Sequence, residues 1–388
     1  MIIDTLVDIH PKRYKVLILG SGKIGLMIAT LLTECREVGP TYEITIADQN
    51  EMALNKLSPT LRQWAIPLDV TDSSQLTEQL TNHDVVINAL PYYLTSTIAT
   101  AAAATTCHYL DLTEDVKSTE QVRTLAENAG SAFIPQCGLA PGYISIVGYH
   151  MTQGFDTLRD LYLRVGALPK YPSNALKYNL TWSTDGLVNE YLHPCDAIVM
   201  GTRQSVAPLE ALSEFSLDGI RYESFNTSGG LGSLCDTLEG KVSNLNYQSV
   251  RYPGHQALMR ALIQDLRLGE RPKLLKDILE YAIPATMQDV VLVYVSVSGE
   301  KKGRLLQETY SRKIYSRQIA GERWSAIQVT TASAVCAVLD LLCNGTLPQK
   351  GFIKQEDISF EAFIQNRFGR NYHYAAADEK DISLMSVA

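Results

Sequence analysis

The chain has 388 residues, with 34 Lys or Arg against 42 Asp or Glu, so its formal net charge at pH 7 is −8. Hydrophobic residues make up 46% of the sequence, which is typical of a globular protein and excludes a disordered or collagen-like chain. At about 150 residues per domain the length predicts two domains. The acidic balance argues against a protein that binds nucleic acid.

The cysteines and histidines do not indicate a metal centre. The seven cysteines include no C-x-x-C pair, and the seven histidines show no H-x-x-x-H spacing. We therefore expect neither a disulfide framework nor a metal site.

The sequence also predicts no membrane partner. The longest apolar candidate, Ala334 to Leu342, contains Asp340 and is shorter than the ~18 apolar residues that span a bilayer. Asp4 and Asp8 do not fit the basic start of a signal peptide. The expectation is a soluble cytoplasmic protein.

From Lys15 to Pro141, short β-branched runs alternate with stretches that are apolar at helical spacing. Strands are predicted at residues 15–19, 43–47, 64–68, 85–89, 108–111 and 132–135. Helices are predicted at residues 24–35, 51–57, 73–81, 94–106 and 117–128. Such alternation is typical of parallel βαβ units whose sheet is covered on both faces. Residues 1–142 are therefore predicted to form a doubly wound, Rossmann-type α/β domain.

The pattern changes after Pro141-Gly142. A helix is predicted at residues 144–153, and longer alternating segments predict strands at residues 160–165, 178–183, 290–298 and 305–319. Residues 143–320 are thus expected to form a second, mixed α/β domain.

Residues 321–388 form a third segment. Thr330-Thr331 can cap a helix from Ala332 to Cys343, which Asn344-Gly345 can end. Gly351-Phe-Ile353, a helix at residues 359–366 and a polar tail from Asn371 follow.

Gly20-Ser-Gly-Lys-Ile-Gly25 forms a G-x-G-x-x-G motif directly after the first predicted strand and at the start of a helix. In this context the first glycine makes the tight turn, the second lets a pyrophosphate approach, and the third lets the helix pack on the strand. The N–H groups of the helix N-terminus then face the phosphates. The motif predicts a dinucleotide site, with a glycine turn that binds nothing as the alternative.

Asp48 ends the second predicted strand, 23 residues after Gly25. A carboxylate here accepts hydrogen bonds from the adenosine ribose and repels a 2′-phosphate. Since Gln49-Asn-Glu51 contains no Arg, the sequence favours NAD, with NADP possible if an Arg comes from elsewhere. A solvated acid in a turn is the alternative.

The other strands end at the same crevice, where doubly wound sheets bind ligands. Asp69-Val70 is expected near the adenine, and Asn88-Ala-Leu-Pro91 near the nicotinamide. Asp111-Leu-Thr113 and Cys137-Gly-Leu-Ala-Pro-Gly142 follow the next two strands. Each acid can instead cap the following helix, and the prolines can simply end their strands.

In the second domain, Arg251-Tyr-Pro-Gly-His255 places a cation near a titratable ring. The planar guanidinium of Arg251 matches a carboxylate through two hydrogen bonds. His255 can carry a proton, although a lone loop histidine is more often structural. Asn179-Leu-Thr-Trp-Ser183 ends a predicted strand with hydrogen-bond donors, and Trp182 can equally anchor the domain core.

These motifs occur in the order seen in the saccharopine dehydrogenase family, which the sequence resembles over most of its length. They are the glycine-rich turn, Leu68-Asp-Val-Thr-Asp72, Val85-Val-Ile-Asn-Ala-Leu-Pro-Tyr92, Cys137–Gly142 and Arg251–His255. The chain looks closest to the branch of saccharopine reductases, L-lysine 6-dehydrogenases and carboxynorspermidine dehydrogenases. Asn189-Glu-Tyr191 resembles the middle of the lysine 6-dehydrogenases.

The resemblance implies a homodimer built by the second domain, and a segment 321–388 that returns to the Rossmann domain. It implies NAD(P)-dependent hydride transfer at a carbon bonded to nitrogen, in saccharopine or L-lysine. A polyamine precursor such as carboxynorspermidine is the alternative substrate, and a dinucleotide-binding regulator without turnover is the alternative class. Because Asp48 fits NADPH poorly, NAD and the amine-oxidising direction are favoured.

The resemblance and the strand ends together select the candidate site residues. Those expected at the dinucleotide are Gly20, Gly22, Lys23, Ile24, Gly25, Asp48, Asp69, Val70, Ala89, Leu90 and Pro91. Those expected at the amino-acid substrate are Tyr92, Gly138, Leu139, Pro141, Gly142, Trp182, Ser183 and Arg251. Asp111 and His255 are hypothesised, from position alone, as the base for the amine proton and for water.

The charges in the cleft are expected to distinguish the substrates. A substrate with two or three carboxylates needs two or more cations, whereas lysine needs one cation and an anion for its α-ammonium. The number of Arg and Lys side chains that face Pro91 therefore distinguishes a substrate with several carboxylates from lysine.

Overall fold

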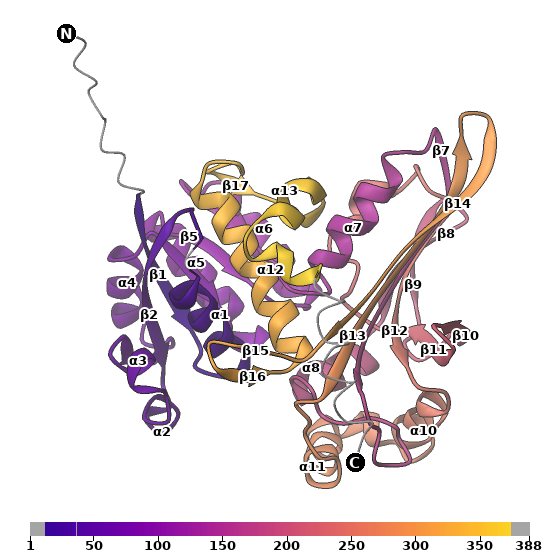
Figure 1. Ribbon diagram of the computed structural model, residues 1–388, viewed down its shortest axis with the longest axis horizontal. Helices are drawn as coiled ribbons and strands as arrows, with labels where there is room; N and C mark the ends of the chain where they lie inside the picture. The colour runs from indigo at the N-terminus through magenta and orange to yellow at the C-terminus, as the bar shows by residue number, and fades with distance from the viewer. Residues whose placement is uncertain (1–11, 36, 374–388) are drawn as a thin grey trace, which may run out of the picture.

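The computed structural model describes residues 12–35 and 37–373, which form two α/β domains around two main sheets (Figure 1). Asp4 and Asp8, on which the signal-peptide argument rests, lie outside the described residues, as does the end of the polar tail.

The first sheet is parallel throughout, in the order β17-β6-β5-β4-β1-β2-β3. Its strands are β1 Arg13–Leu19, β2 Thr41–Asp48, β3 Ala65–Pro67, β4 Val85–Asn88, β5 His108–Asp111, β6 Ala132–Ile134 and β17 Gly351–Phe352. The strand order reverses between β1 and β4, which is the switch point where such sheets bind ligands. The predicted doubly wound sheet is confirmed.

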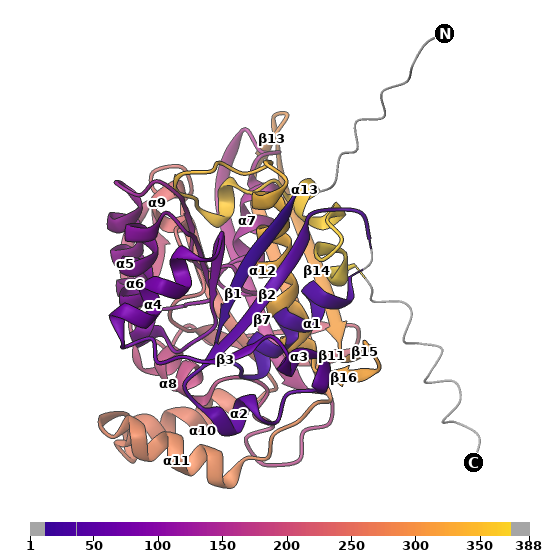
Figure 2. The same cartoon turned by 90° about the vertical axis from the view of Figure 1, so that its left-hand side faces the viewer.

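Helices cover both faces of this sheet (Figures 1 and 2). They are α1 Lys23–Glu34, α2 Glu51–Leu54, α3 Pro59–Arg62, α4 Ser73–Thr81, α5 Thr95–Thr105, α6 Val116–Ala126 and α12 Ala326–Cys343. Alternate residues of β1 point to opposite faces: Val16 and Ile18 pack in the core with α1 and α12, whereas Leu17 and Leu19 pack with α4, α5 and α6.

A local side chain sets the start of α4. The carboxylate of Asp72 accepts hydrogen bonds from the N–H groups of Ser74 and Gln75, at 3.0 and 3.1 Å, and so caps α4. The helix predicted at residues 51–57 ends early, at Leu54, so the predicted end is wrong. A separate helix, α3, follows with Ser58 as its N-cap and Pro59 as its first residue.

The second sheet belongs to the predicted mixed α/β domain and has the order β10-β11-β12-β7-β13-β14, with β8 paired to β12 and β9 paired to β8. Its strands are β7 Thr157–Pro169, β8 Cys195–Val199, β9 Thr202–Val206, β10 Ser213–Leu217, β11 Ile220–Asn226, β12 Asn244–Arg251, β13 Asp289–Lys301 and β14 Arg304–Tyr315. Only the pair β12–β7 is parallel among the pairs of this sheet in the described residues.

The remaining elements border this second sheet or connect the two. The helices are α7 Tyr143–Thr152, α8 Thr184–Leu192, α9 Leu234–Leu238, α10 His255–Arg260, α11 Pro272–Ala282 and α13 Phe360–Gln365, and a small ribbon joins β15 Arg317–Ile319 to β16 Glu322–Trp324. The predicted strand at residues 178–183 is wrong: Leu180 forms only an isolated bridge with Ala285, and Ser183 is the N-cap of α8.

The buried helix α12 joins the two domains. It starts at Ala326 rather than at the predicted Ala332, because Ser325 and Gln328 form a capping box. Asp289 at the start of β13 also accepts hydrogen bonds from the N–H groups of Ala326 and Ile327. Within the described residues α12 is the one helix long and apolar enough to cross a membrane, and 89% of it is buried inside the fold.

After α12 the chain runs back to the first sheet. β17 pairs with β6 in parallel, so this late segment extends the Rossmann sheet by one strand (Figure 1). The predicted domain boundaries at residues 142 and 320 remain predictions, since the cores of the two sheets are continuous through α7 and α12.

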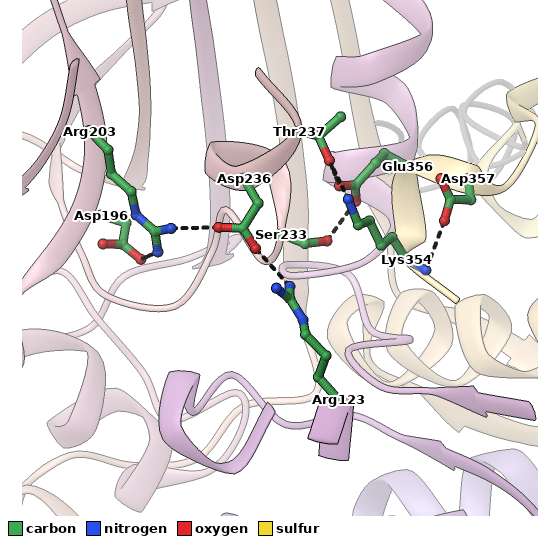
Figure 3. A network of polar contacts seen from close by, with 9 residues as sticks. All are labelled: Arg123, Asp196, Arg203, Ser233, Asp236, Thr237, Lys354, Glu356 and Asp357. Atoms are coloured by element: carbon green, nitrogen blue, oxygen red, sulfur yellow. Dashed lines mark hydrogen bonds and ion pairs between the residues drawn. The ribbon is translucent and has the colours of Figure 1, made fainter. Parts of the chain in front are cut away.

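A polar network crosses between the domains at α9 (Figure 3). Asp236 of α9 accepts from Arg123 of α6 at 2.7 Å and also pairs with Arg203 of β9. Glu356, just after β17, accepts from Ser233 at 2.8 Å and from Thr237. Side chains of α9 therefore link the second domain to the first.

Candidate active site

A cavity of about 560 Å³ lies between the carboxyl ends of the first sheet and one face of the second domain. Its first wall consists of the segments that follow the parallel strands: Gly22–Ile24 at the start of α1, Ala89–Tyr92, Leu112–Glu114 and Gly138–Ala140. This is the position at which doubly wound sheets bind ligands.

The opposite wall comes from β12, β7 and α8. Tyr247, Ser249 and Arg251 alternate along β12, so all three side chains point to the cavity face of the second sheet. From α8, Gly186 and Glu190 stand one turn apart on the side that lines the cavity.

The glycine-rich turn has one glycine that the protein's own packing does not require. Gly20 has φ +104°, and a Cβ at Gly25 would lie 1.9 Å from the carbonyl oxygen of Gly20, so the turn itself needs both glycines. A Cβ at Gly22 would meet no protein atom within 4 Å, and α1 has no side-chain cap there. The open space and the uncapped helix N-terminus fit a dinucleotide pyrophosphate.

Asp48 is tied to the same turn. One of its carboxylate oxygens accepts hydrogen bonds from the Ser21 N–H at 2.8 Å and the Ser21 hydroxyl at 2.7 Å, and the other accepts from the Asn50 N–H at 2.9 Å. The carboxylate thus stands beside the glycine turn, which fits the expected contact with a ribose.

The structure brings many of the expected residues to the cavity. Those that line it are Gly22, Lys23, Ile24, Ala89, Leu90, Pro91, Tyr92, Gly138, Leu139, Trp182, Ser183 and Arg251. Those outside the lining are Gly20, Gly25, Asp48, Asp69, Val70, Pro141, Gly142, Asp111 and His255.

For four of these residues, local structure explains why they do not line the cavity. The side chain of Val70 is buried in the core, and exposed Asp69 instead accepts from the N–H and hydroxyl of Thr71, which lowers the pKa of its carboxyl. Pro141 and Gly142 close the buried turn before α7, where a Cβ at Gly142 would lie 2.1 Å from the oxygen of Gly138. The proposed contacts of Pro141 and Gly142 with substrate are therefore corrected.

Asp111 does not reach the cavity, so its role as base is not supported. It is fully buried, and its carboxylate accepts from the Gln136 N–H at 2.8 Å, the Thr113 N–H at 3.0 Å and the Tyr109 hydroxyl at 2.8 Å. Burial raises the pKa of Asp111 to about 6. Its position beneath the loops indicates that it holds them together.

His255 is also corrected. It is buried, with Nδ1 2.9 Å from the carbonyl oxygen of Leu176 and Nε2 3.1 Å from the hydroxyl of Tyr191. Burial and the nearby Arg251 lower the pKa of His255 to about 3. A neutral ring with both nitrogens engaged positions Tyr191 and cannot reach a substrate.

Arg251 is a buried cation at the cavity wall. Its Nε donates to the Tyr191 hydroxyl at 3.0 Å and its Nη1 to the carbonyl of Val250 at 2.8 Å, and the guanidinium lies 5.1 Å from the centre of the Tyr178 ring. Within the described residues it forms no ion pair with a carboxylate within 4.0 Å. This arrangement fits a guanidinium that binds the carboxylate of a ligand.

Two carboxyl groups of the cavity were not among the expected site residues. Burial raises the pKa of Glu114 to about 7 and the pKa of Glu190 to about 8. Glu114 follows the predicted strand end Asp111-Leu-Thr113 by one residue, and Glu190 lies in the Asn189-Glu-Tyr191 motif. The sequence signal that could have found Glu190 is its spacing of four residues from Gly186, which places both residues on the same face of α8.

The fold and the site define a two-domain protein with a dinucleotide-binding turn and a ligand cavity beside it. Residues 16–134 match the saccharopine dehydrogenase NADP binding domain, and residues 138–368 match the saccharopine dehydrogenase C-terminal domain. The chain belongs to the saccharopine dehydrogenase family, which confirms the resemblance and the expected dinucleotide-binding domain.

Relatives in sequence are distant. The chain is 22% identical over 325 residues to mitochondrial alpha-aminoadipic semialdehyde synthase of Bos taurus, covering 78% of this chain and 33% of that protein. It thus spans about a third of the length of this mammalian relative. It is 24% identical over 360 residues to saccharopine dehydrogenase [NADP(+), L-glutamate-forming] of Pyricularia oryzae, covering 86% of this chain and 76% of that protein.

Solved structures share the fold. The apo saccharopine dehydrogenase (L-Glu forming) of Saccharomyces cerevisiae gives a TM-score of 0.72 at 17% identity, covering 88% of this chain and 94% of the other. The homospermidine synthase of Legionella pneumophila, in complex with NAD, gives 0.63 at 12% identity, covering 93% and 90%.

Proposed function

We propose that this chain is an NAD(P)-dependent oxidoreductase that acts on the C–N bond of a lysine-derived amino acid. One observation carries the proposal: the open glycine turn at Gly22 and the buried guanidinium of Arg251 line one cavity. A dinucleotide bound at the first can meet a substrate held by its carboxylate at the second.

Each part of the cavity then has a task. The dinucleotide supplies the hydride acceptor when bound. The loop Ala89–Tyr92 and the loop Gly138–Ala140 shape the space for substrate, and Arg251 holds its carboxylate. Glu114 replaces Asp111 and His255 as the candidate base for the amine proton, because it lines the cavity and its pKa lies near neutrality.

NAD is the proposed cofactor. Asp48 is held beside the glycine turn by Ser21, so its carboxylate faces the region of the ribose, where a 2′-phosphate would be repelled. A homodimer is proposed from the family resemblance, and a cytoplasmic location stays a prediction from the sequence.

A polyamine precursor such as carboxynorspermidine is a second candidate substrate. The cavity is lined by the acids Glu114, Asp185, Glu190 and Glu280 and by the cations Lys23 and Arg251, and Asp185 also pairs with Lys276 at 2.6 Å. An acidic lining supports a substrate with amino groups, and it supports three-carboxylate saccharopine less well.

The test follows the absorbance of reduced cofactor with NAD or NADP and with L-lysine, saccharopine or carboxynorspermidine. We expect reduction of NAD, faster than of NADP, with an amine that carries one carboxylate. If the protein binds NAD and reduces it with none of these amines, even at alkaline pH, the regulator without turnover is the better description.

A further inference from the structure

Arg251 and Glu190 are a cation and a carboxyl group that share the cavity without pairing. Both side chains are nearly fully buried, at 3% and 6% exposure, and both line the cavity. They are near enough for the guanidinium to lower the pKa of Glu190 against the larger effect of burial. Among the described residues, however, no ion pair within 4.0 Å involves either of them.

Each of the two groups is held in place by its own element. Arg251, the last residue of β12, is fixed by Tyr191 and the Val250 carbonyl, and His255 supports Tyr191 from behind. Glu190 is fixed through the backbone of α8, since its carbonyl accepts from the Ser228 N–H at 3.0 Å. The side chain of Glu190 has no hydrogen-bond partner in the described residues, so its carboxyl is free to meet a ligand.

A buried cation and a buried carboxyl that do not touch are costly unless a ligand pairs with both. An α-amino acid carries a carboxylate and an ammonium on one carbon, and can therefore bridge two such groups. Glu114 lies on the other wall of the cavity, near the loop Ala89–Tyr92 where the nicotinamide is expected, and suits a second amine.

We propose that Arg251 and Glu190 form a subsite for the head group of an α-amino acid, with Arg251 binding the carboxylate and Glu190 the α-ammonium. Resting on the proposed function, this places the reacting amine at the far end of the substrate, beside Glu114. The substrate class is then an α-amino acid with one carboxylate and a distal amine, of which L-lysine is the simplest probe.

The experiment measures ligand binding to the NAD-saturated protein by titration calorimetry. The probes are L-lysine and 6-aminohexanoate, which keeps the carboxylate and the distal amine and lacks the α-ammonium. Wild-type protein is expected to bind 6-aminohexanoate at least tenfold more weakly than L-lysine. Saccharopine is also expected to bind more weakly than L-lysine, because its extra carboxylates meet no further buried cation in the described lining.

The variant Glu190→Gln keeps the shape and removes the charge. It is expected to weaken L-lysine binding at least tenfold and to change 6-aminohexanoate binding less than twofold. Glu270→Gln, an exposed acid paired with Arg267 outside the cavity, is the matched control and should change neither. Equal loss of both ligands in Glu190→Gln, or no loss of L-lysine, overturns the proposal.

Failure to fold and failure of the proposed function can both be recognised. If Glu190→Gln loses its circular-dichroism signal, the variant has not folded, and wild-type protein alone then tests the proposal. Equal affinities of wild-type protein for L-lysine and 6-aminohexanoate would contradict the subsite. If L-lysine binds as expected and no amine yields reduced cofactor, the subsite stands and the oxidoreductase proposal fails.

Discussion

At the scale of single residues, the position of each acid or histidine in the fold determines whether it can exchange a proton with a substrate. Asp111 and His255 carry the right chemistry for proton transfer, yet their polar atoms are engaged by Gln136, Thr113, Leu176 and other groups away from the cavity. Glu114 and Glu190 are ordinary glutamates in sequence, and burial at the cavity wall raises the pKa of both carboxyl groups.

The raised pKa of Glu190, about 8, predicts how L-lysine binding depends on pH. Burial favours the protonated form, while Arg251 from β12 favours the ionised form and Glu114 from the loop after β5 opposes it. Only ionised Glu190 attracts an ammonium, so the dissociation constant of L-lysine should fall from pH 6 to pH 8, by up to about tenfold per unit.

Calorimetry over pH 6–8 measures this dependence. Glu190→Gln should lose the share of the fall that Glu190 causes over the whole of pH 6–8, and keep only the share below pH 7, where Glu114 with a pKa of about 7 titrates. The same profile in both proteins would contradict the assignment to Glu190.

At the scale of elements, α12 shows how a distant residue can set a helix start. The sequence offers Thr330-Thr331 as a cap, but the helix begins at Ala326, where Ser325 caps it and Asp289 of β13 accepts from the first N–H groups. Asp289 of the strand and Ala326 of the helix, 37 residues apart in the chain, thus form a capping contact.

Asp289→Ala is expected to lower the free energy of unfolding by about 2 kcal/mol, because two buried N–H groups lose a charged acceptor. Urea denaturation followed by circular dichroism measures the change. Asp277→Ala, an exposed acid on α11, serves as control and should stay within about 0.5 kcal/mol of wild type. Similar losses in both variants would show that the contact with α12 contributes nothing.

At the scale of the whole molecule, the cavity has one wall in each domain. The relative placement of the domains therefore sets the distance between the glycine turn and Arg251. The network of Arg123, Asp236 and Arg203 is one of the polar contacts that hold this placement (Figure 3).

Asp236→Ala should therefore weaken amine binding while leaving the dinucleotide turn intact. Partly exposed ion pairs contribute about 0.5–1 kcal/mol, so the dissociation constant of L-lysine is expected to rise about two- to fivefold. That of NAD should change less than twofold, and calorimetry measures both. Arg267→Ala, which breaks the exposed pair with Glu270, is the control, and an equal loss of NAD affinity would argue against a domain effect.

The sequence by itself determined the elements and the ligand crevice. The period of apolar residues, the glycine turn and caps such as Asp72 act between near neighbours in the chain. Six of the seven strands that the structure describes in the first sheet, β1 to β6, and the lining residues Gly22, Ala89 and Arg251 could therefore be predicted.

Only the tertiary structure decided which polar groups remain available to a ligand. The partners that occupy His255 come from Leu176 and Tyr191, far away in the chain, whereas Glu190 acquires none in the described residues. Burial and pairing depend on residues that folding brings together, and no local pattern encodes them. For that physical reason the dinucleotide turn and Arg251 were visible in the sequence, while the carboxyl groups of Glu114 and Glu190 at the cavity were not.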